Sequence, residues 1–169
     1  MDLYTLQEDN GDYLTLDKVI DELSSFSEEE KNSVKDVKAY DIIFCYQIIL
    51  GGPNNGKYKR RHAIVTNPKS KSWRNAMDFI PITSSYNSNL HTLYEQHKIK
   101  IKDRKNANLS TNKDLYMNLD TLYNNIIYGK PLRYVKKEFI AKKVGTLQKE
   151  DFKQLLMYQT IWDAQKKGK

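Results

Sequence analysis

The feature that most constrains the fold of this chain is the close spacing of its strand-like segments after residue 38. Runs of β-branched and aromatic residues, typical of strands, occupy residues 39–50, 61–67, 77–83, 97–102 and 116–120. The segments between them are rich in Gly, Pro, Asn, Ser and Lys, the composition of turns and surface loops. Parallel strands are joined by crossover helices, and these strands lie too close together for such connections. The sequence therefore predicts an antiparallel, strongly curved sheet or a small barrel.

Helical patterns precede these strand segments. Asp17 is placed to cap an amphipathic helix that runs toward Phe26, and Ser27 with Glu30 forms the capping box of a second helix. We therefore expect two short helices before the first strand.

Helical patterns also follow the strands. Residues 135–144 form a Lys-rich run that we expect to be helical and to end at Gly145. Thr146 is then the expected N-cap of an amphipathic helix that reaches Trp162. The predicted fold class is α+β, mainly β, with an N-terminal helical extension and a C-terminal helix.

Charge divides the chain into two parts. Residues 1–38 hold eleven Asp and Glu and four Lys, net −7, whereas residues 39–169 hold ten acids and twenty-four bases, net +14. Such a basic body attracts polyanions, which makes nucleic acid the leading partner, although many solvated lysines would give the same composition. The acidic extension would either shield the basic body in cis or pack as a helical pair that adds stability.

Other features weaken several classes of function. Cys45 is the single cysteine, so an internal disulfide and a Cys-rich zinc site are excluded, and we expect a cytoplasmic location. The longest apolar run, residues 42–50, is far shorter than the ~20 residues of a membrane helix, and the acidic start lacks the pattern of a signal peptide. Residues 51–57 match the spacing of a phosphate-binding loop, but Tyr58 stands where that motif needs Ser or Thr. The histidines and acids show no convincing ligand spacing, so we predict no metal and no cofactor.

Two neighbouring strand segments carry the candidate site. Residues 57–67 begin with four cations and a histidine and then become apolar, and residues 79–85 end an apolar run in hydroxyl side chains. If the two strands pair, Arg61 and Thr83 meet at one edge of the sheet. The alternative is a solvated hairpin end, the common role of a charge run.

Several short motifs, taken in order, resemble the MazF/PemK family of toxin endoribonucleases. They are Asp41-Ile42-Ile43, a Gly-rich loop, Arg61-His62-Ala63-Ile64-Val65, Ile80-Pro81-Ile82-Thr83-Ser84, and Val144-Gly145-Thr146-Leu147 before an amphipathic helix. The resemblance covers residues 39–163, and it departs from the family pattern at Tyr40, usually glycine, and at His62, usually proline. It implies a small SH3-like antiparallel barrel domain over residues 39–169, with residues 1–38 as a separate acidic extension.

The resemblance implies metal-independent cleavage of single-stranded RNA, in which the 2′-hydroxyl attacks the neighbouring phosphate and leaves a cyclic phosphate. Arg61 matches the family's arginine, whose planar donors can hold two phosphate oxygens. Thr83, with Ser84 beside it, matches the family's hydroxyl residue. His62 titrates in the right range to act as acid or base, yet strand alternation points it away from Arg61. A homodimer and a separate neutralising antitoxin are further implications of the resemblance.

Binding of single-stranded RNA would draw on the cations and the indole around these strands. These residues are Lys57, Lys59, Arg60, Lys69, Lys71, Trp73 and Arg74. Trp73, flanked by cations in a polar loop, is placed to stack a splayed base, and its alternative role is to cover the sheet edge.

Two other functions stay open. One is a non-catalytic SH3-like barrel that binds protein or nucleic acid, and the other is an antiphage endoribonuclease with an RNA antitoxin. Catalysis requires Arg61 and Thr83 to lie close together in an open basic groove, whereas burial of either residue favours the binding module.

Overall fold

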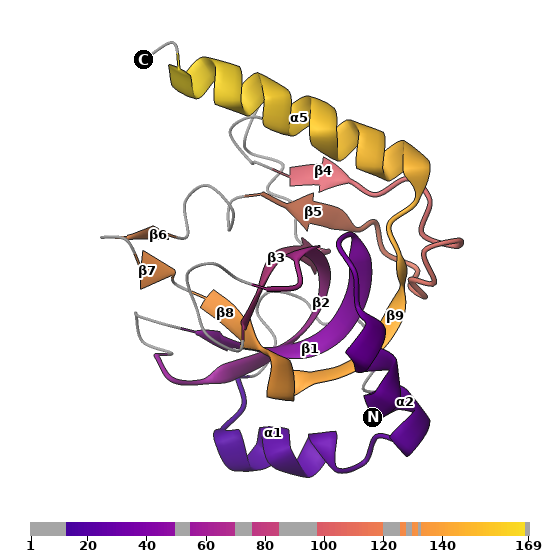
Figure 1. Ribbon diagram of the computed structural model, residues 1–169, viewed down its shortest axis with the longest axis vertical. Coiled ribbons are helices and arrows are strands. Elements are labelled where there is room, and N and C mark those ends of the chain that lie inside the picture. The colour runs from indigo at the N-terminus through magenta and orange to yellow at the C-terminus, as the bar shows by residue number, and fades with distance from the viewer. Residues whose placement is uncertain are drawn as a thin grey trace.

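The computed structural model describes residues 13–49, 55–69, 76–84, 98–119, 126–127, 130–131 and 133–167. The fold is α+β and mainly β, as predicted, with one large antiparallel sheet and helices packed around it (Figure 1). Within these ranges no helix has both the length and the apolar character needed to cross a membrane.

All five predicted strand segments form strands. They are β1 (Asp41–Ile49), β2 (Tyr58–Asn67), β3 (Ala76–Thr83), β4 (Lys98–Lys100) and β5 (Tyr116–Asn118). The predicted β2 was too short by three residues, because Tyr58, Lys59 and Arg60 also pair with β1. The cations of this segment therefore lie in the sheet instead of in a solvated loop.

The sheet runs in the order β2-β1-β8-β3-β5-β4, with β9 (Ile140–Thr146) paired to β1 and with β2 also paired to β3. The short strand β8 (Arg133–Lys136) pairs with two residues of β1 and with two residues of β3. Although β3 pairs with both β8 and β2, the sheet does not close into the small barrel that the resemblance implies. A separate hairpin is formed by β6 (Ile126–Ile127) and β7 (Lys130–Pro131).

The Lys-rich run over residues 135–144 does not form the single helix that the sequence predicts. It forms the end of β8, the 3-10 helix η2 (Lys137–Phe139) and most of β9, because pairing with β1 buries Ile140 and Ala141. Tertiary contacts override the local helical tendency here. Gly145 serves a close approach rather than a helix end, since a Cβ there would lie 2.3 Å from the carbonyl oxygen of Ala107.

The two predicted N-terminal helices and the predicted C-terminal helix all form, but not with every predicted cap. Helix α1 (Leu16–Leu23) is capped by Thr15 instead of Asp17, and α2 (Glu28–Ser33) has the predicted capping box of Ser27 and Glu30. The 3-10 helix η1 (Val34–Asp36) leads into β1. The C-terminal helix α5 (Lys149–Lys167) begins three residues after Thr146.

Strand β2 is covered on both faces over its first eight residues. On one face Ile64 joins a large cluster that includes Ile42 and Ile82, and on the other Ala63 packs with Ile43. A third cluster joins the extension to the sheet, with Val19 and Phe26 packed against Phe44 and Tyr46 of β1. The described part of the extension thus shares a core with the body, which favours the stabilising role over loose shielding.

Candidate functional site

Pairing of β2 with β3 brings the two predicted site residues together in register. His62 lies opposite Ile82, and Ala63 lies opposite Pro81. Arg61 and Thr83 come one residue beyond the last of these pairs, and by strand alternation they lie on the face that Ala63 and Pro81 share. Ser84 follows directly after β3 and is half-buried.

Two more polar side chains occupy the same face. Lys59 precedes Arg61 by two residues on β2, and Gln47 lies opposite Lys59 on β1. We call Gln47, Lys59, Arg61 and Thr83 the β2 polar cluster. Their exposed fractions are 0%, 1%, 3% and 0%. The cluster is therefore an enclosed basic surface and not the open groove that catalysis was expected to require.

Part of the N-terminal extension lies along the edge of β2 next to this cluster. Leu14 exchanges two backbone hydrogen bonds with Tyr58, at N···O distances of 2.7 and 2.9 Å. The Tyr13 ring lies over the Lys59 ammonium, 5.2 Å from nitrogen to ring centroid, a cation–π geometry. The chain before α1 thus extends the sheet by one bridge and covers Lys59.

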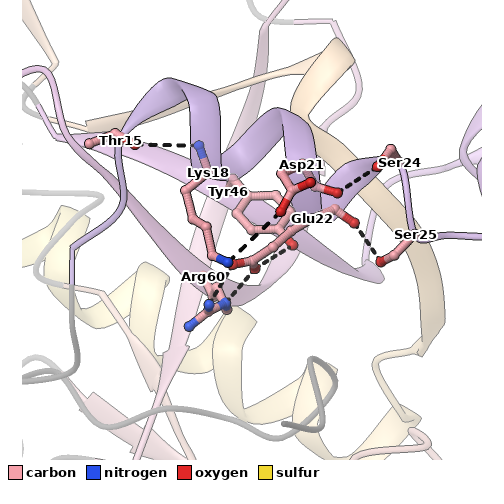
Figure 2. A network of polar contacts seen from close by, with 8 residues as sticks. All are labelled: Thr15, Lys18, Asp21, Glu22, Ser24, Ser25, Tyr46 and Arg60. Atoms are coloured by element: carbon pink, nitrogen blue, oxygen red, sulfur yellow. Dashed lines mark hydrogen bonds and ion pairs between the residues drawn. The ribbon is translucent and has the colours of Figure 1, made fainter.

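The opposite face of β2 carries a buried ion pair. Arg60 donates from Nε and Nη2 to the two carboxylate oxygens of Glu22 on α1, at 2.6 and 2.5 Å (Figure 2). The Tyr46 hydroxyl donates to the same carboxylate at 3.1 Å. Burial alone would raise the pKa of Glu22, but the hydrogen bond and charge of Arg60 outweigh it and lower that pKa. The guanidinium of Arg60, predicted to bind RNA, is thus held by Glu22 on the face opposite Arg61, and its contact with RNA stays a prediction.

His62 lies on the Arg60 face, as strand alternation requires, and not beside Arg61. It is 4% exposed, and its ring packs 5.2 Å from that of Phe44 on β1. Burial, helped by the charge of Lys142 on β9, lowers the pKa of His62 to about 4. The imidazole is neutral near pH 7 and faces away from the β2 polar cluster, so it does not belong to that site.

Cys45 lies opposite Arg61 but is not a nucleophile. It is fully buried, and its Sγ donates to the Arg61 carbonyl oxygen at 3.4 Å. Burial raises the pKa of the thiol to about 12, although the charge of Arg61 opposes this. The thiol therefore stays protonated at neutral pH.

The other predicted RNA contacts divide into two groups. Lys57 and Lys69 are exposed at the two ends of β2. Lys71, Trp73 and Arg74 lie outside the described residues. The expected stacking by Trp73 therefore stays a prediction.

Two buried polar side chains beside β2 were missed as site candidates from the sequence, although each left a signal. Glu22 lies on the apolar side of α1, between Val19 and Phe26, so its carboxylate faces the sheet. A carboxylate buried there needs a cation as its partner. Gln47 interrupts the longest apolar run of the chain, in the middle of a strand buried on both faces. A polar residue in such a run is a candidate for a specific hydrogen-bonding role.

A polar hollow lies away from β2, in the connection between β4 and β5. Its volume is about 410 Å³, and it is lined by Arg104, Lys105, Asn108, Leu109, Ser110, Thr111 and Asn112. Among the described residues, no three His, Cys, Asp or Glu side chains gather in a group that could hold a metal ion. Comparisons of the chain with protein-family models, with curated proteins and with solved structures found no match.

Proposed function

We propose that this protein is a metal-independent endoribonuclease of the MazF/PemK type, which cleaves single-stranded RNA at the β2 polar cluster. The observation that supports this is the in-register pairing of β2 with β3, which puts a guanidinium and a hydroxyl on one basic face. Both groups can donate hydrogen bonds to the same phosphate.

In the proposed reaction, the 2′-hydroxyl attacks its neighbouring phosphorus and the 5′-oxygen leaves, which gives a cyclic phosphate and a free 5′-hydroxyl. Arg61 holds the non-bridging oxygens as negative charge gathers on them, and Thr83 donates to the same phosphate. Ser84 is the second hydroxyl within reach of that end of β3. The group that removes the 2′-hydroxyl proton is left unassigned.

The full enclosure of Arg61 and Thr83 favours a second candidate, a non-catalytic binding module. A phosphate reaches these side chains only when part of their cover moves aside. In the proposed nuclease the cover opens when RNA binds, whereas in the binding module the cluster is a permanent part of the interior.

The cognate antitoxin and the homodimer are proposed from the family resemblance. Helix α5 offers apolar side chains for a second copy, since Leu156 and Met157 are 42% and 53% exposed. The acidic segment of an antitoxin would complement the net +14 of residues 39–169.

The test is incubation of the purified protein with a long single-stranded RNA in EDTA, with mass spectrometry of the product ends. Arg61→Met keeps the length of the side-chain stem and removes the donors, and we expect it to cut the cleavage rate about 10²- to 10³-fold. Arg104→Ala removes one cation far from β2 and serves as the charge-matched control, with unchanged cleavage expected.

Three results decide between the candidates. Cyclic phosphate ends that depend on Arg61 support the nuclease. Binding of RNA without cleavage supports the binding module. Equal cleavage by the wild type and Arg61→Met would show that this site does not carry the activity.

A further inference from the structure

The side chain of Gln47 is completely buried in the middle of β1. Neither its amide nitrogen nor its amide oxygen has a hydrogen-bond partner among the residues that the structure describes. An amide side chain carries two donors and an acceptor with two lone pairs. Because buried polar groups in native proteins are nearly always satisfied, an amide without a partner in the described part of the chain is a candidate to bind a group from outside it.

The neighbours of Gln47 define the chemistry of that missing group. Lys59 lies directly opposite it, and Arg61 is its diagonal neighbour, with Cβ atoms about 7–8 Å apart in a regular sheet. The apolar side chains of this face, Ile43 and Ala63, lie on the far side of Arg61 and Cys45 from Gln47. The surface therefore combines positive charge at one point with an amide donor and acceptor at another. A nucleotide has the complementary pair, a phosphate and a base edge.

We propose that Gln47 is a base-reading residue, whose amide hydrogen-bonds the edge of an unpaired adenine while Arg61 and Thr83 hold the adjoining phosphate. This inference rests on the proposed function. Adenine presents an amine donor beside a ring-nitrogen acceptor, the pair that a glutamine amide satisfies with two hydrogen bonds. Bases of single-stranded RNA are free to turn this edge toward the protein.

Binding of the base replaces contacts that enclose the cluster now. Lys59 lies between Gln47 on β1 and Tyr13 on the other edge of β2. Displacement of the Tyr13 ring would uncover Lys59 on the face of the sheet that Gln47 and Arg61 share.

The test measures the midpoint of thermal unfolding and the affinity for RNA. A structural role and a ligand-binding role of Gln47 predict different results in these two measurements. Gln47→Met keeps the side-chain length and removes the unsatisfied amide. In the ligand-free protein, we expect its midpoint of thermal unfolding to rise by about 2–4 °C. Its affinity for a single-stranded adenine oligonucleotide should fall about tenfold, whereas its affinity for a uracil oligonucleotide of equal length should change less than about twofold.

Gln148→Met is the matched control. The Gln148 amide donates to the carbonyl oxygens of Asn106 and Thr146, at 3.2 and 2.8 Å, so its removal loses satisfied hydrogen bonds. We expect this variant to lower the unfolding midpoint and to leave both RNA affinities unchanged. Gln47→Leu repeats the experiment with a second apolar side chain in case the thioether perturbs packing.

The outcomes separate this inference from the function on which it rests. If both Gln47 variants bind the two oligonucleotides as the wild type does, while Arg61→Met loses binding, the base-reading role is wrong and the RNA site stands. If the Gln47 variants unfold at a lower temperature with unchanged affinities, the amide is structural. If the wild type binds neither oligonucleotide, both proposals are overturned.

Discussion

The two faces of β2 hold their arginines in different ways. On one face Arg60 is held in a bidentate pair by Glu22 and lies beside the apolar cluster that joins α1 to the sheet. On the other face Arg61 shares its surroundings with Lys59, Thr83 and an amide that has no described partner. The first arrangement locks one part of the chain to another. The second gathers two cations, a hydroxyl and an amide on one enclosed face, so burial alone does not distinguish the two arrangements.

The largest expected effect comes from breaking the ion pair between Arg60 and Glu22. Arg60→Ala leaves the Glu22 carboxylate buried without its cation, and we expect a loss of about 3–5 kcal/mol in the free energy of unfolding, measured with urea. The double variant Glu22→Gln with Arg60→Met removes both charges and keeps an acceptor for Tyr46, so it should recover most of that loss.

The RNA affinities of the Arg60 and Arg61 variants test whether the two faces of β2 have separate roles. At a temperature at which it remains folded, Arg60→Ala should bind RNA as the wild type does, because this guanidinium faces away from the β2 polar cluster. A loss of RNA affinity that matches that of Arg61→Met would show that the two faces are not functionally separate.

The second prediction concerns the pH dependence of stability and His62, which lies on the same face of β2 as Arg60. His62 has a folded-state pKa of about 4 against 6.5 for an exposed histidine, because it is buried near Lys142. Below pH 6.5, His62 therefore takes up a proton in the unfolded chain. In the folded protein the same ring is protonated only below about pH 4. The contribution of His62 to stability is fully present above pH 6.5 and falls through this window, by about 2 kcal/mol down to pH 5.

The measurement is urea unfolding at pH 7 and pH 5 for the wild type and His62→Gln. The variant lacks the titrating ring, so the difference between its two unfolding free energies should be smaller by about that amount. Cleavage by the wild type between pH 7 and 8 should not follow the titration of His62, since that imidazole is neutral there. A pH-independent wild-type stability would contradict the burial of a neutral imidazole.

The smallest expected effect comes from uncovering Lys59 of the β2 polar cluster. Tyr13→Ala removes the ring that covers Lys59, at a cost of about 1 kcal/mol in stability, and should raise RNA affinity about fivefold, since RNA no longer displaces that contact. Tyr13→Phe keeps the cation–π contact and is the matched control. Filter binding at fixed low salt gives the comparison, and weaker binding by Tyr13→Ala would mean that Tyr13 contacts RNA directly.

Local chemistry in the sequence determined the strands, the capping box of α2 and the alternation that separates Arg61 from His62. These features depend on neighbouring residues and on the two-residue period of a strand, so they are readable from the order of side chains. The same reasoning failed for residues 135–144, where lysines at helix-like spacing end in β8 and β9. Pairing with β1 buries Ile140 and Ala141, and no local pattern contains that information.

The enclosure of the site was decided only by the tertiary structure. Arg60 and Arg61 are adjacent and chemically identical, yet α1 supplies a carboxylate to one and the register of β3 supplies a hydroxyl opposite the other. Partners separated by 20 or more residues in the chain meet because strand pairing and helix packing bury apolar surface elsewhere. The sequence therefore determined which charges exist and which face each occupies, and the fold decided which residues surround each of them.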